Sequence, residues 1–155
     1  MMQAVELKKK NAVRKVRKIA EASFKKYGYI IHWNGHKQKG SGNQFRIITR
    51  ERDCPGWRIA YLIVRDKEID CLEHHPGSME SFEPLQGKSI LYVCNQKKPR
   101  DIEAFMLDKP VVLKKGIWHG VVSVTDEAHV KITENNRVKL VRYKLGYTLY
   151  GKRHK

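Results

Sequence analysis

The feature that most constrains the fold is a long series of short β-forming runs separated by turn residues. From Tyr29 onward, stretches rich in Val, Ile, Leu, Tyr and Phe alternate with breakers such as Asp53-Cys54-Pro55-Gly56 and Lys97-Lys98-Pro99-Arg100. Many short strands at regular spacing predict a β-barrel or a β-sandwich. The runs that we interpret as strands are Gln44–Thr49, Arg58–Val64, Ile69–Glu73, Ser89–Cys94, Glu103–Leu107, Val111–Leu113, Val121–Thr125, His129–Thr133, Val138–Tyr143 and Tyr147–Tyr150.

One helix is expected before these runs. Apolar residues recur there at spacings of three and four, which places them on one helical stripe. Lys and Arg fill much of the other face, and Gly28 is a natural stop. A basic amphipathic stripe could bind a membrane surface, but packing against its own domain is the commoner outcome. We therefore predict a basic N-terminal helix within residues 1–27. The stripe consists of Val13, Val16, Ala20, Phe24 and Tyr27.

Length and composition indicate one globular domain over residues 1–155, with basic strands and a tail over 137–155. The chain is 41% hydrophobic and 31% charged, and a chain of 155 residues can bury a continuous core. It contains no apolar run long enough for a membrane span, and its N-terminus is too rich in Lys for a signal peptide. We expect a cytoplasmic protein with no membrane partner.

The three cysteines favour neither a disulfide framework nor a zinc ribbon. Cys54, Cys71 and Cys94 are odd in number, widely separated and without a Cys-x-x-Cys pair. Cys71 and Cys94 lie in apolar runs, so we expect them to be buried and inert.

The formal net charge of +16 is compatible with nucleic acid, with an anionic substrate or with a Lys-rich surface. Much of it sits near the two ends of the chain, where basic residues are usually solvated. We favour a small anionic substrate over nucleic acid. Binding to nucleic acid would predict an affinity that falls steeply with added salt.

Two stretches concentrate imidazole and carboxylate side chains. In an extended chain, Glu73 and His75 point to one face while His74 points to the other. A turn after His75 can bring Glu80 back beside them, and His119 can complete the set from a later strand. Such nitrogen and oxygen donors suit Zn, Ni, Mn or Fe(II), and the sequence does not choose among these metals. The alternative is a surface turn with ordinary solvated carboxylates.

The order of these residues resembles the two signature motifs of the cupin superfamily. Glu73-x-His75 is followed by Glu80 and Gly87, and then by Gly116-x-x-His119. Glu73 stands where the first histidine of the motif is expected. The resemblance implies a mainly β fold: a cupin-type double-stranded β-helix barrel, or jelly roll, preceded here by the N-terminal α-helix.

A closer resemblance, over roughly residues 21–134, is to the ureidoglycolate lyase family, also called ureidoglycolate hydrolase. It is carried by the opening stretch 21–31, by Leu72-Glu73-His74-His75-Pro76 through Ser81–Gly87, by Ile102–Phe105 and by Ile117-Trp118-His119. The family implies a commonly dimeric barrel that cleaves ureidoglycolate to glyoxylate and urea, with a divalent metal. In this chain Glu80 occupies a position where the family usually has Gln.

The resemblance assigns roles to individual residues. It implies His75, Glu80 and His119 as catalytic residues, and Glu73, His75, Glu80 and His119 as ligands of the divalent metal. Arg65 is the candidate for holding the substrate carboxylate. Trp118 could stack on the substrate, although an aromatic residue in a barrel strand is more often part of the wall. We expect a homodimer; a non-catalytic cupin that binds a small anionic ligand is the alternative.

Overall fold

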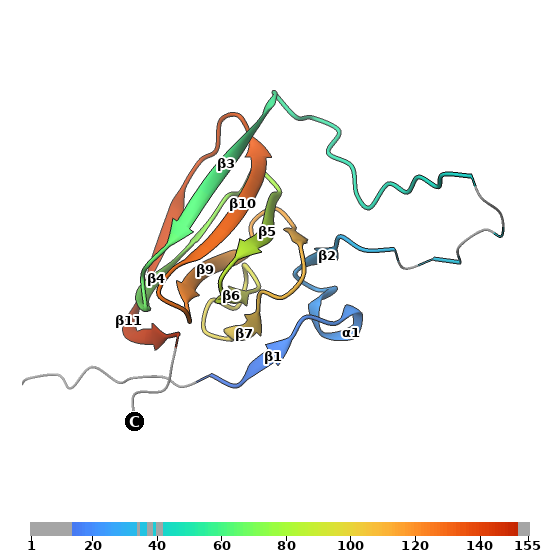
Figure 1. The fold of residues 1–155 in the computed structure, drawn as a ribbon. Coiled ribbons are helices and arrows are strands. Elements are labelled where there is room, and N and C mark those ends of the chain that lie inside the picture. Colours follow the sequence, from blue (N-terminus) through green and yellow to red (C-terminus); the bar gives the residue numbers. More distant parts are fainter. Residues whose placement is uncertain (1–13, 34, 37–38, 40–41, 152–155) are drawn as a thin grey trace, which may run out of the picture.

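The computed structural model describes residues 14–33, 35–36, 39 and 42–151. Within them the chain forms two β-sheets and one short helix (Figure 1). The elements in chain order are β1 (Val16–Lys18), α1 (Glu21–Phe24), β2 (Gly28–Ile30), β3 (Trp57–Val64), β4 (Glu68–His74), β5 (Glu80–Gln86), β6 (Ser89–Cys94), β7 (Glu103–Met106), β8 (Val111–Leu113), β9 (Trp118–Ser123), β10 (Ala128–Asn135) and β11 (Val141–Tyr150).

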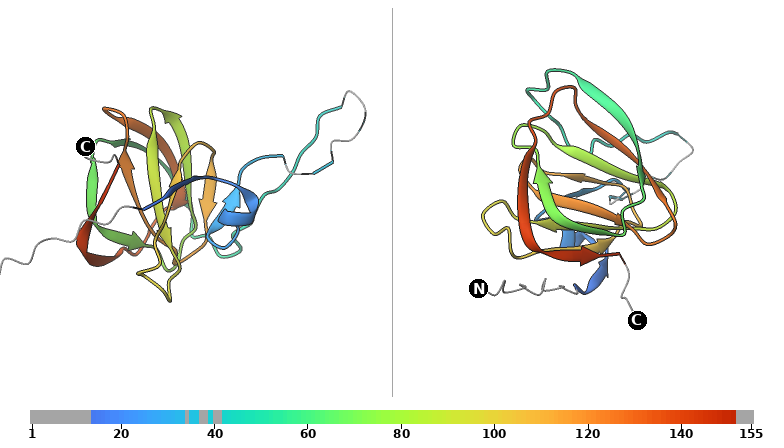
Figure 2. Two further views of the ribbon diagram at one scale, coloured as in Figure 1. Left: turned by 90° about the horizontal axis from the view of Figure 1, so that it is seen from below. Right: turned by 90° about the vertical axis from the view of Figure 1, so that its left-hand side faces the viewer.

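The strand order confirms the jelly-roll barrel. One sheet has the order β1-β7-β6-β9-β4-β11 and the other the order β2-β8-β5-β10-β3. From β3 to β11 the chain passes to the opposite sheet at every step except β6 to β7, so the strands wind around a common interior (Figure 2). The strand pairs are antiparallel apart from β1 with β7. This winding between two sheets is what distinguishes a jelly roll from a simple meander.

The middle of the larger sheet is buried on both faces. Leu91 and Val93 of β6 join the main apolar cluster inside the barrel, whereas Ile90, Tyr92 and Cys94 join a second cluster on the outer face of the same sheet. All six residues of β6 are buried. Burial on both faces explains why Ser89–Cys94 reads as a continuous apolar run rather than as an alternating one.

The prediction of a long N-terminal helix is wrong for most of the described residues. Residues 16–18 form β1, which pairs in parallel with β7, and the helix α1 covers only Glu21–Phe24. The exposed edge of β7 offers backbone hydrogen bonds that a helix over 14–20 could not use. The aromatic end of the stripe still packs, since the Phe24 ring lies 5.2 Å from that of Phe105. Residues 1–13 lie outside the described part of the chain.

Further differences concern the strands. The run Gln44–Thr49 forms no strand, and the two C-terminal runs merge into β11, which contains Gly146 at a φ of +77°. Strand β5 was not predicted because Glu80–Gln86 is poor in typical strand formers and includes a proline. Pairing with β8 on one side and β10 on the other imposes the extended conformation. In the described residues, no helix has the length and apolarity that crossing a bilayer requires.

Candidate metal centre

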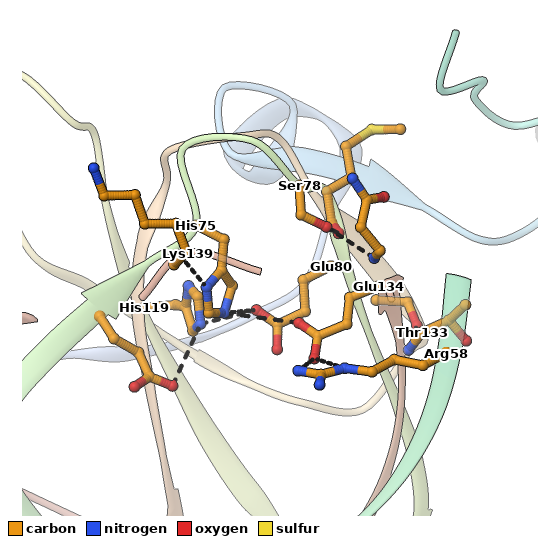
Figure 3. A network of polar contacts seen from close by, with 12 residues as sticks. Arg58, His75, Ser78, Glu80, His119, Thr133, Glu134 and Lys139 are labelled. Carbon is orange, nitrogen blue, oxygen red and sulfur yellow. Dashed lines mark hydrogen bonds and ion pairs between the residues drawn. The ribbon is translucent and has the colours of Figure 1, made fainter. Parts of the chain in front are cut away.

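Four buried side chains from different parts of the barrel meet at one level of its interior (Figure 3). His75 follows β4, Glu80 opens β5, His119 lies on β9 and Glu134 lies near the end of β10. Their side chains are at most 8% exposed. The cluster is assembled by the fold, because the strands that carry these residues are neighbours in space and distant in sequence.

The two motif segments are tied together directly. The backbone N–H of Gly116 donates to the carbonyl oxygen of His75 at 3.0 Å, and Glu73 pairs with His119 across β4 and β9. Gly116 has a φ of +74°, a left-handed conformation that glycine adopts at no steric cost. The glycine therefore allows the turn that brings the second segment against the first.

The donor atoms of the cluster lie within a few ångströms of one another. The Oε2 atom of Glu80 is 3.2 Å from Nε2 of His75 and 3.0 Å from Nε2 of His119. The Oε2 atom of Glu134 is 3.8 Å from Nε2 of His75. A cation bonded at about 2.0–2.2 Å to each donor separates neighbouring donors by about 3.0–3.5 Å. The two distances from Glu80 fall within this range and the distance from Glu134 lies about 0.3 Å above it, a spacing that suits a small divalent cation.

Both imidazoles present Nε2 to the cluster because their other nitrogen is held by backbone. Nδ1 of His75 donates to the carbonyl of Lys139 at 3.1 Å, and Nδ1 of His119 donates to that of Ile117 at 3.0 Å. A donor on Nδ1 leaves the lone pair of a neutral imidazole on Nε2, which is the arrangement of metal-binding histidines.

Three of the converging atoms form no hydrogen bond, although two of them, on Glu80 and His119, lie 3.0 Å apart as an ion pair. They are Oε2 of Glu80, Nε2 of His119 and Oε2 of Glu134, all buried. Unsatisfied buried polar atoms carry a large desolvation cost, and natural proteins rarely leave several together. A bound cation would satisfy all of them at once, so the donor set fits a metal ion.

The electrostatics of the metal-free cluster are those of a tightly coupled ion pair. The adjacent Glu80 carboxylate raises the pKa of His75 to about 9. Burial by itself raises the pKa of Glu80, but the imidazoles of His119 and His75 outweigh it and bring that pKa down to about 2. Burial likewise lowers the pKa of His119, yet the Glu80 carboxylate reverses the direction and raises it. Glu80 is therefore the anionic centre of the group.

Glu73 lies at the rim of the cluster. Its Oε1 is 4.0 Å from Nε2 of His119, its side chain is 40% exposed, and its Oε2 is 3.9 Å from Nε of Arg142. Glu73, His75 and His119 nevertheless lie close enough to share one ion. Glu73 and His75 face inward and His74 faces outward, as the strand parity predicts, and the His74 ring packs on Trp118 at 4.1 Å.

The two residues expected to bind the substrate lie elsewhere. Trp118 precedes the inward-facing His119, so it points to the outer face of its sheet and joins the second apolar cluster. Arg65 follows β3 and pairs with Glu127 at 3.0 Å. It lies seven residues beyond Arg58, roughly 23 Å along an extended strand. Arg58, by contrast, reaches the cluster and binds Glu134.

Glu134 was not singled out from the sequence, although a signal was present. Ala128, Val130 and Ile132 alternate as buried residues along β10, and Glu134 continues the same inward row. A carboxylate at a core position of a strand is costly unless it is paired or binds a metal. The parity of β10 could therefore have marked Glu134.

The fold and the cluster together define the class of this protein, which is a jelly-roll barrel with imidazoles and carboxylates in its interior. Comparison with known sequences gives the family: the profile described as ureidoglycolate lyase matches residues 11–140. The chain belongs to the ureidoglycolate lyase family. It is 22% identical to the ureidoglycolate lyase of Rhizobium leguminosarum over 120 residues, and 26% identical to that of Agrobacterium fabrum over 123 residues. Each alignment covers 67% of this chain and 72% of the relative.

Among solved structures, the chain is similar to oxalate decarboxylase from Bacillus subtilis. The sequence identity is 17%, the TM-score is 0.43, and the match covers 58% of this chain. The chain spans only 24% of the length of that decarboxylase.

Proposed function

We propose that this protein is a metal-dependent ureidoglycolate lyase, which cleaves the C–N bond of ureidoglycolate to release glyoxylate and urea. The proposal is supported by membership of the family together with one observation: His75, Glu80 and His119 converge in the barrel interior, where Oε2 of Glu80 and Nε2 of His119 form no hydrogen bond. These residues would hold a divalent ion, which would supply Lewis-acid chemistry toward the α-hydroxycarboxylate of the substrate.

The residues of the chain would then divide the remaining tasks. His75, Glu80 and His119 hold the centre, and the carbonyls of Lys139 and Ile117 keep the imidazoles oriented. The elimination needs one proton removed from the hydroxyl group and one delivered to the departing urea nitrogen. Glu73 suits this transfer because it borders the cluster and is in contact with water. The buried walls around the centre limit competing reactions with solvent.

The proposal is tested by elemental analysis of the purified protein combined with a urea-release assay on ureidoglycolate. His119→Ala should abolish both metal uptake and turnover, because it removes one of the three donors that would hold the ion. Retained turnover in this variant would refute the assigned site. Metal uptake by the wild-type protein without urea release would instead support a non-catalytic barrel that binds a small anion.

For the partner, we propose a second copy of this chain, paired through β3. Alternate residues of β3 form an exposed apolar stripe, and β3 is an edge strand in the described residues. The strand carries one charged residue, Arg58, whose charge is offset by Glu134. A chain of net charge +16 repels its own copy least at such a face. Antiparallel pairing of β3 with itself would use the same patch twice, as two-fold dimers do. The stripe consists of Trp57, Ile59, Tyr61 and Ile63, which are 66%, 56%, 62% and 39% exposed.

A further inference from the structure

We infer that Glu134 is a ligand of the metal in this barrel and that Arg58 is the residue that positions it. The inference rests on the proposed metal centre and identifies the carboxylate that completes it. It replaces Glu73, which the cupin-like motif suggests, by a residue outside both motif segments.

A row of charged residues crosses three neighbouring strands at this level. Glu80 on β5 lies directly opposite Glu134 on β10, and Glu134 lies directly opposite Arg58 on β3. Two carboxylates facing each other across adjacent strands repel, and burial strengthens the repulsion. Arg58 offsets the negative charge of Glu134. Glu80 is paired instead with the imidazoles of His75 and His119. A divalent cation bound by both Glu80 and Glu134 would remove the repulsion between the two carboxylates.

Arg58 leaves one defined oxygen of Glu134 for the metal. Its Nε and Nη2 both donate to Oε1 of Glu134, at 2.9 and 2.6 Å. The other oxygen, Oε2, is buried, has no hydrogen-bond partner and faces Nε2 of His75 at 3.8 Å (Figure 3). A guanidinium that holds one carboxylate oxygen fixes the direction of the second, which is how residues behind a metal ligand orient it.

The competing carboxylate is less suited to the role. The side chain of Glu73 is 40% exposed, compared with 7% for Glu134. Both oxygens of Glu73 have partners only at 3.9 to 4.0 Å, so nothing holds its carboxylate toward the centre. The exposed group can satisfy its charge with water, whereas the buried Oε2 of Glu134 cannot.

The proposed donor set of two imidazoles and two carboxylates favours some divalent metals over others. Carboxylate oxygens favour Mn²⁺ and other hard cations, whereas imidazole is also accepted by Fe²⁺, Ni²⁺ and Zn²⁺. The two ionised carboxylates neutralise the charge of a divalent ion. We therefore expect Mn²⁺ to bind at this centre, so Mn²⁺ serves as the probe.

The test compares Glu134→Gln with Glu73→Gln, two matched losses of a carboxylate oxygen. Gln can keep the carbonyl oxygen that accepts from Arg58 and places an amide where Oε2 was. Binding of Mn²⁺ to the chelator-treated full-length protein is followed by the electron paramagnetic resonance signal of the free ion. We expect Glu134→Gln to weaken the affinity at least about tenfold, and Glu73→Gln to change it by less than about threefold. Equal losses in both variants, or a larger loss for Glu73→Gln, would overturn the inference.

A second variant covers the case in which Glu134→Gln unfolds. Arg58→Met removes the positioning cation at a side chain that is 46% exposed, so the fold should tolerate it. We expect its Mn²⁺ affinity to fall about tenfold, and an unchanged affinity would contradict the role of Arg58. Wild-type protein that binds no divalent ion would refute the proposed metal centre itself. Normal Mn²⁺ binding by both Glu134→Gln and Arg58→Met would refute this inference alone.

Discussion

Replacing Glu80 by Gln should remove much of the pH dependence of stability in the metal-free protein between about pH 6.5 and pH 9. The Glu80 carboxylate lies 3.2 Å from Nε2 of His75 and raises the pKa of His75 from 6.5 to about 9. Because the folded pKa is the higher one, the stabilisation is fully present below pH 6.5 and is lost as the pH rises through 9. One pKa unit corresponds to about 1.4 kcal/mol, so the loss is about 3 kcal/mol.

The lowered pKa of Glu80 arises from the same ion pair, so the two pKa shifts report one stabilising interaction and their free energies are not added. That pKa falls from 4.5 to about 2, so its stabilisation is present above pH 4.5 and is lost as the pH falls through 2. The ion pair therefore contributes its full stabilisation between about pH 4.5 and pH 6.5. In this window Glu80→Gln should cost the metal-free protein the most stability.

Urea unfolding in the presence of a chelator, followed by tryptophan fluorescence, measures the effect. With a denaturant slope of about 2 kcal/mol/M, the wild-type midpoint should fall by roughly 1–2 M between about pH 6 and pH 9. The midpoint of Glu80→Gln should change much less. Glu83→Gln is the control, because Glu83 lies on the same strand and pairs with Lys131 outside the cluster. Equal pH slopes in the wild type and Glu80→Gln would refute the coupling of Glu80 to His75.

Saturating Mn²⁺ should reverse the sign of this pH dependence for the wild-type protein. Protons and the metal compete for the same imidazole nitrogens, so raising the pH strengthens metal binding and with it the folded state. A metal-loaded protein that loses stability between pH 6.5 and pH 9 as steeply as the metal-free protein would place the ion away from His75.

Three further predictions concern other parts of the barrel. Burial raises the pKa of the Cys94 thiol to about 12. Iodoacetamide near pH 8 should therefore alkylate the exposed Cys54 and spare Cys94 in the folded protein, which mass spectrometry of the labelled peptides measures. Ile59→Lys places a charge in the apolar stripe of β3 and should convert the proposed dimer to a monomer in sedimentation experiments, whereas an unchanged mass would remove β3 as the interface. Gly28→Ala should destabilise the fold by about 1–3 kcal/mol in urea unfolding, because the added methyl would overlap the backbone carbonyl of Val112, and a neutral effect would contradict this close strand contact.

Local sequence patterns predicted a barrel or sandwich of short strands, and the motif resemblance narrowed this to a jelly-roll barrel with His75, Glu80 and His119 at its centre. Short β-forming runs fix where strands can lie, and the period of two separates inward Glu73 and His75 from outward His74. The same parity applied to Trp118 would have turned it outward, because it adjoins the inward His119. These outcomes depend on the chain within a few residues, so the sequence alone suffices for them.

The remaining features depend on which strands become neighbours. Glu134 became part of the cluster because β10 lies beside β5, and Arg58 reaches it because β3 lies on the other side of β10. The predicted N-terminal helix gave way to β1 because the edge of β7 was available to pair with it. Pairing between distant strands is decided by the packing of the whole barrel, whereas propensity and periodicity report only on the local chain.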